Sequence, residues 1–352
     1  MNVFKMFAKL KINSLLFIVL ILANVHVVCA QSQQMMFGDS VRTGVPFSKD
    51  PYVIRFQHRF LMYYSVPAFK DQSGNSFGWG IGIAESNDLI HWKRIGEVNR
   101  DPRAIYESKG MCAPCLLVQG NKIHLFYQTY GNGKMDAICH AWSTDGLFFT
   151  RNQTNPIFRP DGSWNCGRAI DAEVIRFKGK YFLYYATRDA AYKIQMQGVA
   201  MAPGSTHFDR KDWTNLSKEG PMLKPELPWE QDCIEGASII NKKGQLYLFY
   251  AGAYNNAPQQ IGVAKSNDGI HWERLFKEPF LPNGKAGDWN SSESGHPHIF
   301  ANPAGEDYLF FQGNKTIGKD WIISNVKIGW RKGFPFLNTR NSELDDSQKL
   351  KN

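Results

Sequence analysis

The chain has 352 residues, of which 43% are hydrophobic and 14% aromatic, with a formal net charge of +9. This length is sufficient for one large domain or two ordinary domains with a real hydrophobic core. The Lys and Arg residues are scattered between acids and form no basic helix or known nucleic-acid module, which argues against nucleic-acid binding. Apolar residues occur in short runs typical of strands rather than in long helical stripes, so we predict an all-β fold.

Residues 1–30 have the three parts of a signal peptide. The charged end contains Lys5, Lys9 and Lys11. An apolar run over residues 15–23 follows, which is too short for a comfortable membrane span, and cleavage is expected near Ala30. Val28 is bulkier than a lipoprotein site normally accepts before its cysteine, which disfavours anchoring at Cys29. We therefore predict a protein that is secreted or periplasmic, with no membrane span.

The rest of the chain repeats one pattern five times: a short strand, a polar turn, and a second strand rich in aromatic residues. The repeats are marked by Asp50, Pro114, Asp171, Glu235 and His296, at steps of 64, 57, 64 and 61 residues. A self-similar period with four strands per unit is the signature of a β-propeller, in which each sheet packs on the preceding and the following one. We predict a five-bladed β-propeller over residues 31–337, with four antiparallel strands per blade, and a solvated tail over residues 338–352.

Three of the repeats open on an acid, namely Asp50, Asp171 and Glu235. One acid before a strand is most simply a turn residue, but three at one phase of a repeat indicate a site. In a propeller the inner strands line the central channel, so these acids are expected to meet at one mouth of it. Like charges in a small space raise one another's pKa, so one of them can stay protonated near neutrality. Glycoside hydrolysis needs one protonated carboxylic acid and one carboxylate.

These motifs carry a family resemblance. The sequence reads Asp50-Pro51-Tyr52, Ala113-Pro114, Ile170-Asp171, Glu235-Gly236 and Gly295-His296 in this order. At blade spacing they resemble the five-bladed glycoside hydrolases of family 43, over essentially the whole mature chain. The resemblance implies that Asp50 is the general base and Glu235 the general acid, and that Asp171 orients Glu235 and raises its pKa. It further implies inversion at the anomeric carbon, with acid and base about 6.5–9.5 Å apart.

Two positions depart from the family pattern. Cys112 stands where a tryptophan usually precedes Ala-Pro, and Ala237 stands where a proline is more usual. Both indicate a divergent subgroup, so the usual arabinofuranosidase or xylosidase specificity does not transfer directly. The related families 117 and 32 remain alternatives, although the opening motif of family 32 is absent.

Other side chains are candidates for substrate binding. His296 and His298 alternate on one short strand, so we expect only one to face the channel, and the resemblance favours His296. It would lie beside the acid or reach a structural calcium ion in the channel through water; no metal ligand is certain and no cofactor is required. Arg168 is expected to pair with Asp171 or bind substrate, and Arg188 to lie on the same rim. Candidate sugar platforms are Trp79, Phe77, Trp164 and Tyr130, and Cys112 would line the pocket.

Five cysteines remain in the mature chain, an odd number that cannot pair fully within one molecule. They are Cys112, Cys115, Cys139, Cys166 and Cys233. Cys112 and Cys115 have the spacing of a redox or zinc pair, but no second pair follows, so we interpret them as packed thiols. A disulfide between Cys166 and Cys233 is conceivable in an oxidising compartment.

The sequence thus predicts a secreted, inverting and exo-acting glycoside hydrolase that removes terminal sugars from plant or algal polysaccharides. Its sugar would be of the kind handled by arabinofuranosidases, xylosidases or galactosidases. A catalytically silent carbohydrate-binding propeller is the rival from another class, although such a relative should lack one of the three acids. A glycoside phosphorylase would need a cationic phosphate pocket, for which only Arg168 and Arg188 are available. The predicted partner is a carbohydrate, and the sequence favours no particular oligomeric state.

Overall fold

A computed structural model describes residues 34–338. The predicted signal peptide with Cys29 and nearly all of the predicted tail lie outside the described residues. Within the described part, no helix has the length and hydropathy that a bilayer crossing requires. The helical elements there are single 3-10 turns: η1 (Ile105–Glu107), η2 (Gly133–Met135), η3 (Arg210–Asp212) and η4 (Pro228–Glu230).

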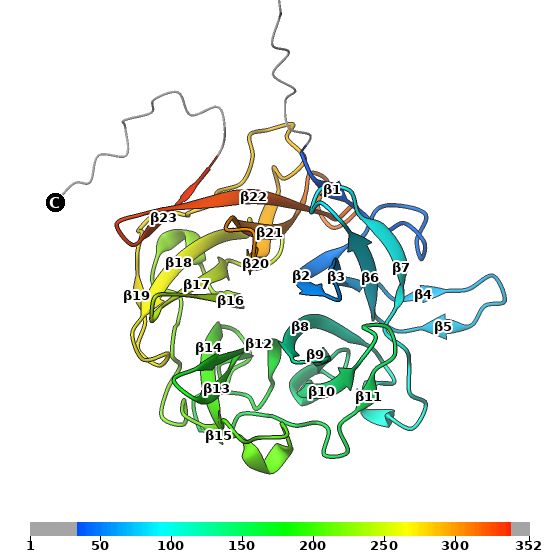
Figure 1. The fold of residues 1–352 in the computed structure, drawn as a ribbon, viewed down its shortest axis with the longest axis horizontal. Coiled ribbons are helices and arrows are strands. Elements are labelled where there is room, and N and C mark those ends of the chain that lie inside the picture. Colours follow the sequence, from blue (N-terminus) through cyan, green and yellow to red (C-terminus); the bar gives the residue numbers. More distant parts are fainter. Residues whose placement is uncertain (1–33, 339–352) are drawn as a thin grey trace, which may run out of the picture. The chain divides into compact units, whose positions relative to one another are not determined.

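The strands form five antiparallel sheets arranged as blades around a centre (Figure 1). Blade 1 contains β2 (Lys49–Phe56), β3 (Arg59–Val66), β6 (Gly80–Ser86) and β7 (Lys93–Glu97). Blade 2 contains β8 (Met111–Gln119), β9 (Lys122–Thr129), β10 (Ile138–Ser143) and β11 (Thr150–Arg151). Blade 3 contains β12 (Ile170–Phe177), β13 (Lys180–Arg188), β14 (Gln195–Pro203) and β15 (Thr214–Asn215). Blade 4 contains β16 (Ile234–Lys242), β17 (Gln245–Gly252), β18 (Gln260–Ser266) and β19 (Glu273–Arg274).

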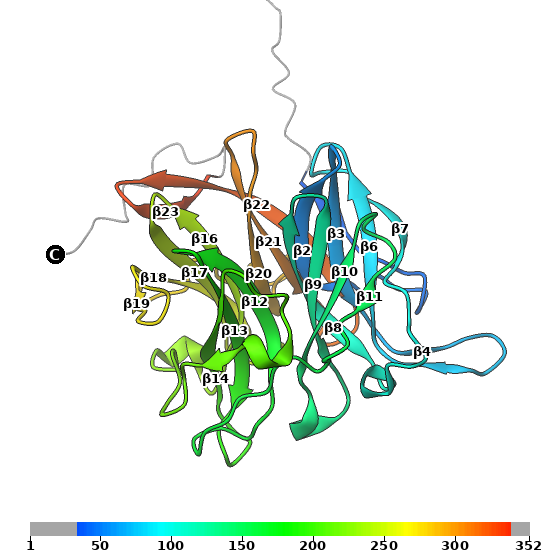
Figure 2. The same ribbon diagram turned by 60° about the horizontal axis from the view of Figure 1, so that its bottom comes forward.

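Blade 5 closes the ring with strands from both ends of the described chain. It contains β20 (Glu293–Ala301), β21 (Asp307–Asn314) and β22 (Ile322–Arg331). Two short strands, β1 (Met36–Phe37) and β23 (Phe334–Leu337), pair with different parts of the same edge of β22. The predicted five-bladed propeller is therefore confirmed, and its last blade joins the beginning of the chain to the end. A small hairpin of β4 (Phe69–Lys70) and β5 (Ser76–Phe77) projects from blade 1 (Figure 2).

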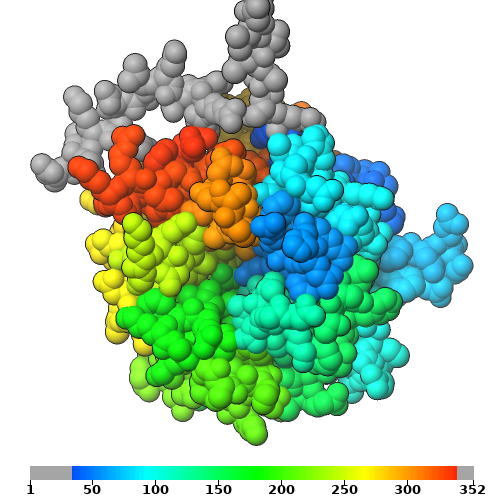
Figure 3. Space-filling model, in the orientation of Figure 1, coloured from blue at the N-terminus to red at the C-terminus, as the bar shows by residue number. Residues whose placement is uncertain are grey.

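The hydrophobic core is divided into five clusters, one at each junction between neighbouring blades. The cluster between blades 1 and 2 joins Ile54 and Leu61 to Leu116 and Leu125, and the other four junctions have clusters of the same kind. This arrangement explains why the second strand of each repeat is apolar on both faces, since each sheet is covered by a blade on either side. Segments of all five blades meet around the centre of one face (Figure 3).

A ring of side chains connects the inner strands of the blades around the axis. The inner strand is the first strand of each blade: β2, β8, β12, β16 and β20. Four of the five blades place a side chain against the backbone of the following inner strand. The amides of Val174, Ile239 and Ile299 bond to Cys115 Sγ, Glu173 Oε1 and Ser238 Oγ, at 3.2, 2.9 and 3.0 Å. The fourth contact joins His298 Nε2 to the carbonyl of Val53 at 3.0 Å. Because these bonds are buried, they hold the strand ends that carry the predicted acids in fixed positions.

Candidate active site

Each inner strand carries a β-bulge at the same height, where one residue adopts the left-handed conformation. The register of each inner strand shifts at this point, and the five bulge residues are Asp50, Ala113, Asp171, Gly236 and His296, with φ between 42° and 60°. Bulges re-aim side chains, and left-handed residues other than glycine cost free energy that the surrounding structure must offset. The five bulges therefore form the ring on which the site is built.

The bulges correct the predicted alignment of the repeats. Asp50, Asp171 and His296 are true equivalents, but the equivalent of Asp171 in blade 4 is Gly236, and Glu235 lies one residue earlier. Likewise the equivalent in blade 2 is Ala113 and not Pro114. The prediction that the three acids share one phase is therefore wrong for Glu235. The bulge nevertheless brings it to the same mouth, because the residue before the bulge also points toward the axis.

His296 lies between two of the predicted catalytic carboxylates. Its Nδ1 is 3.1 Å from Asp50 Oδ1, and its Nε2 is 3.2 Å from Glu235 Oε1. Burial opposes a charge on this imidazole, but the charges of Asp50 and Glu235 outweigh it and raise the pKa of His296 to about 10. The structure thus brings Asp50, Asp171 and Glu235 together around the imidazole of His296. Of the two predicted histidines, His296 and not His298 lies beside the acids.

The carboxylate of Glu235 is held by two amides that the sequence analysis missed. Gln259 Nε2 donates to Oε1 at 2.7 Å, and Gln195 Nε2 donates to Oε2. Burial would raise the pKa of Glu235, but the hydrogen bond and charge of His296 and the bond from Gln259 lower it. The resemblance implied a raised pKa for Glu235, whereas its surroundings in this structure lower that pKa.

Asp171 is the carboxyl group that holds a proton most readily. Its burial, with the charges of Glu235 and Asp50 adding to it, raises its pKa to about 7, although His296 and Arg168 act against this. Its backbone amide donates to Gln128 Oε1 at 2.6 Å, while its Oδ2 has no hydrogen-bond partner among the described residues. A buried carboxyl oxygen without a partner is ready to bond to a hydroxyl group.

The third strands of the blades supply a second ring of side chains around the mouth. Each blade contributes the residue at the equivalent position near the start of its third strand, as the sheet registers align them. From blade 1 to blade 5 these residues are Trp79, Asp136, Gln195, Gln259 and Trp321. Trp79 lies 5.3 Å from Tyr130 and 5.7 Å from Phe47, measured between ring centroids. Blades 1 and 5 thus give an aromatic wall, and blades 2 to 4 give a polar wall. Lys49 stands at the aromatic side with Nζ 4.3 Å from the Trp321 ring centre.

The predicted arginines lie near the polar wall but have protein partners. Arg168 Nε is 3.5 Å from Asp136 Oδ2, so Arg168 pairs with Asp136 rather than with Asp171. Arg188 donates to Gln195 Oε1 at 3.2 Å, and it is thereby connected to Glu235 through that amide. Neither arginine therefore contacts a catalytic carboxylate directly.

The remaining candidates occupy supporting positions. Cys112 is buried, and burial beside the charges of Asp50 and Asp171 raises its pKa, so it is a neutral thiol. All five cysteines of the described residues are free, including Cys166 and Cys233. Among the predicted platforms, Phe77 stacks on Phe69 in the projecting hairpin, and Trp164 donates its Nε1–H to the carbonyl of Ser217.

Glu293, the first residue of β20, is fully buried. It accepts hydrogen bonds from Gln312 Nε2 at 2.7 Å and from the backbone amide of Asn256 at 2.8 Å. Gln312 Oε1 in turn accepts the backbone amide of Asp50 at 2.8 Å. Glu293 therefore positions the base candidate through Gln312.

The donor atoms at the axis are a poor match for directly bound calcium. Asp171, Glu235 and His296 place ligand atoms within 4.8 Å of one another. Calcium takes about six to eight oxygen ligands, whereas Glu235 is already held by His296 and two amides. A cavity of about 30 Å³ beneath these groups has room for a water molecule or two. Calcium reached through water stays a prediction from the resemblance.

Fold and site together define a carbohydrate-active propeller with its carboxyl groups at one mouth. The family model "Glycosyl hydrolases family 43" matches residues 45–335. The chain therefore belongs to glycoside hydrolase family 43.

Solved structures agree on the fold. A thermostable family-43 glycoside hydrolase superposes with a TM-score of 0.66 at 18% identity, covering 86% of this chain and 96% of the other. An endo-1,4-beta-xylanase from Bacteroides thetaiotaomicron gives 0.64 at 21% identity, covering 83% and 94%. An uncharacterized protein of Mycobacterium tuberculosis is 25% identical over 181 residues, which are 49% of this chain and 56% of that relative. The match thus spans only about half the length of this curated relative.

Proposed function

We propose that the protein is an inverting glycoside hydrolase in which Asp50 activates water and Glu235 protonates the leaving oxygen. Asp171 would hold a substrate hydroxyl and set the protonation of Glu235. The observation that carries the proposal is the convergence of these three carboxyl groups, from three different blades, around His296.

The placement of His296 supports inversion over retention. An imidazole ring and two contacts of 3.1 and 3.2 Å lie between the carboxylates of Asp50 and Glu235. A separation by a whole imidazole ring fits the roughly 6.5–9.5 Å of inverting enzymes better than the about 5–5.5 Å of retaining enzymes.

The proton that the reaction needs is already in the site. Asp171 holds this proton more readily than Glu235, because the pKa of Asp171 is raised and that of Glu235 is lowered. A sugar that separates His296 from Glu235 would remove the main cause of the low pKa of Glu235, so that Glu235 gains the proton only with substrate bound. Catalytic hydrogen bonds commonly reach their working geometry only in the substrate complex.

The walls of the mouth support a sugar as the substrate. Trp79 is half-buried and offers an apolar surface for one face of the ring, while the unpartnered Oδ2 of Asp171 offers an acceptor for a hydroxyl group. We further propose that the enzyme is secreted, in keeping with the expected signal peptide, and that it acts on the ends of plant or algal polysaccharide chains. The sugar would be tested among arabinosides, xylosides and galactosides.

Leaving-group dependence tests the assignment of the acid. Glu235→Gln should lower turnover about 10²- to 10⁴-fold on an oligosaccharide but much less on a dinitrophenyl glycoside, whose leaving group needs no proton. Asp50→Asn should lose activity on both substrates, since the attack by water is impaired in each case. Proton NMR of the first product tests inversion, because an inverting enzyme releases the anomer opposite to that of the substrate.

Two results would overturn the proposal. Near-wild-type turnover of either variant on the oligosaccharide would remove the assigned roles. If Asp171→Asn, and not Glu235→Gln, were the variant rescued by the dinitrophenyl leaving group, Asp171 would be the acid. A circular dichroism melt of each variant shows whether the fold is intact.

A further inference from the structure

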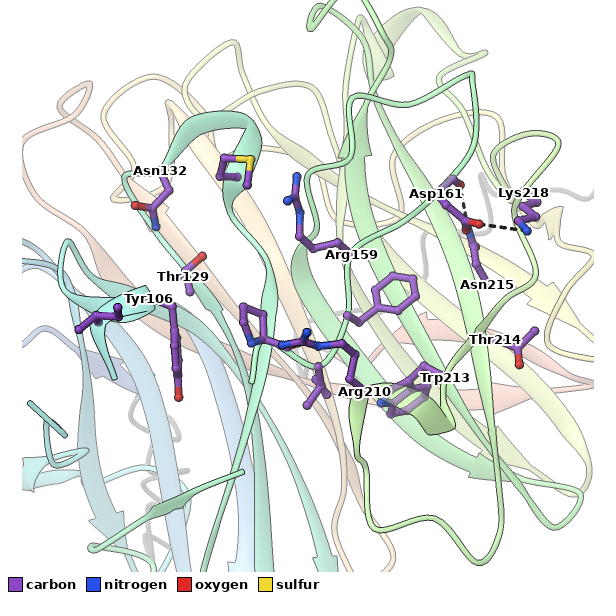
Figure 4. Close-up of a pocket in the computed structure, with 15 residues that line it drawn as sticks. Tyr106, Thr129, Asn132, Arg159, Asp161, Arg210, Trp213, Thr214, Asn215 and Lys218 are labelled. Carbon is purple, nitrogen blue, oxygen red and sulfur yellow. Dashed lines mark hydrogen bonds and ion pairs between the residues drawn. The ribbon is translucent and has the colours of Figure 1, made fainter. Parts of the chain in front are cut away.

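A groove much larger than the axial cavity lies between blades 2 and 3. Its volume is about 850 Å³, and it is lined by the segment after β11, by β15 and by the loops that lead into β8 and β10 (Figure 4). Its rim exposes two large apolar side chains, Ile105 at 80% and Met135 at 61%. Apolar side chains exposed to this degree next to a hollow are available for contact with a ligand.

Two residues of the groove lining contact residues that lie near the catalytic mouth. Arg159, in the groove, donates to the carbonyl of Gly167 at 2.9 Å, and the next residue, Arg168, contacts Asp136 at the mouth. The backbone amide of Asn132, which also lines the groove, donates to Asp136 at 3.0 Å. The groove therefore lies next to residues of the mouth, on the side of blades 2 and 3.

The charges in the groove are unbalanced toward the positive sign. Asp161 is paired with Lys218 at 3.1 Å, and it also accepts bonds from Asn215. Arg159 and Arg210 bond to backbone carbonyls, Arg210 to that of Pro156 at 2.8 Å, and among residues 34–338 neither pairs with a carboxylate. Both guanidinium groups thus have N–H donors left for an anionic partner, in the planar arrangement that suits a carboxylate.

The groove wall contains one further donor. Trp213 is 9% exposed, and its Nε1–H has no hydrogen-bond partner within the described part of the chain. Figure 4 shows Trp213 beside Arg210 on the same wall. A buried donor without a partner is costly unless something else satisfies it, and an oxygen-rich ligand in the groove would do so.

We propose that this groove binds an acidic, uronate-bearing stretch of the polysaccharide whose end is cleaved at the mouth. The inference rests on the proposed glycoside hydrolase function for the identity of the chain, but the binding itself does not require catalysis. Sugar rings offer apolar faces to Ile105 and Met135, and their carboxylates offer bidentate partners to Arg159 and Arg210. An acidic peptide would match the charges too, but a glycan also accounts for the position of the groove next to the mouth.

Binding assays on the folded protein test this proposal without using turnover. Affinity electrophoresis and calorimetry would compare polygalacturonate with neutral arabinan and with polyglutamate. We expect the wild-type protein to bind polygalacturonate with an affinity that falls with salt, and Arg159→Gln and Arg210→Gln each to weaken it about tenfold or more. Lys211→Gln is the matched control, because Lys211 is exposed and adjacent to Arg210 but does not line the groove.

Three outcomes would overturn the proposal. They are no binding of polygalacturonate by the wild-type protein, equal binding of polyglutamate, or an equal loss in Lys211→Gln and Arg210→Gln. Arg159 also bridges two loops, so melting curves accompany its variant, and Arg210→Gln carries the test if Arg159→Gln unfolds. These outcomes leave the leaving-group test of Asp50 and Glu235 untouched, so the two proposals fail separately.

Discussion

Gln195 and Gln259 occupy the same position in neighbouring blades, and each donates its side-chain amide to a different oxygen of Glu235. The two glutamines thus hold one carboxylate from two neighbouring blades, and we call this pair of amides the clamp. The clamp fixes the plane of the carboxylate and favours its ionised form. In the proposed reaction it therefore orients the acid and sets how readily the acid takes up a proton.

Gln259→Ala should change the pH dependence as well as the rate. Loss of the donor at 2.7 Å raises the pKa of Glu235, so the basic limb of kcat, which reports the substrate complex, should move to higher pH. The rate at the optimum should fall about 10- to 100-fold, because the carboxyl group is less well oriented. Gln245→Ala, in the same blade but bonded to Ser266 at 2.6 Å, is the control. An unchanged basic limb would show that the clamp does not act on the acid.

Gly236 leaves the space that His296 needs. Its φ is +60°, and a Cβ placed there would lie 3.3 Å from both Cα and Nδ1 of His296. Gly236→Ala should displace the imidazole from Asp50 and Glu235, lowering kcat/KM by about tenfold or more and stability by about 1 kcal/mol.

The reverse substitution is the control for backbone strain. Ala113 is the equivalent bulge residue in blade 2, with φ 48°. Ala113→Gly should leave kcat/KM within about twofold and change stability by less than about 1 kcal/mol, since glycine adopts this conformation without a steric cost. Wild-type kinetics for Gly236→Ala would show that the site tolerates a shifted His296.

The sequence was informative where a feature recurs with a fixed spacing. The five aromatic second strands and the Ser-x-Asp turns repeat, so the propeller and the convergence of Asp50 and Asp171 could be predicted from the chain alone. In the structure the three Ser-x-Asp turns are alike, because Asp88, Asp145 and Asp268 each accept backbone amides of their turn. The repeat works as evidence because each copy must pack on its neighbours in the same way.

Features that depend on single residues escaped prediction. A bulge adds a residue without changing the hydrophobic pattern, so nothing in the sequence showed that Glu235 precedes the bulge while Asp171 occupies it. Glutamines are common on surfaces, and Gln195 and Gln259 stand out only when the third strands are aligned. The closing strand β1 has two residues and no periodicity to detect.

Buried titratable groups near the axis make stability depend on pH, and the sign follows from where each binds its proton. Burial raises the pKa of Glu173 to about 8, and the neighbouring carboxylates raise that of His296 to about 10 against the effect of burial. Both groups hold protons more tightly when folded, so their contribution is complete below their unfolded pKa and is lost as pH rises through the folded value. Burial lowers the pKa of three histidines, His124, His140 and His298, so their effect on stability has the opposite sign. Above about pH 6.5 these histidines are neutral in both the folded and the unfolded state, so they no longer make stability depend on pH.

Between pH 7 and 9 the remaining effect therefore has one sign, and the melting temperature should fall as pH rises. Each proton held only by the folded state contributes a slope of up to about 1.4 kcal/mol per pH unit, which corresponds to several degrees. Glu173→Gln cannot ionise, yet its side-chain oxygen can still accept the amide of Ile239, so its melting temperature should fall less steeply over this range. Glu219→Gln, at an exposed position, should keep the wild-type slope. Parallel slopes for Glu173→Gln and the wild-type protein would mean that Glu173 is not the buried acid that ionises in this range.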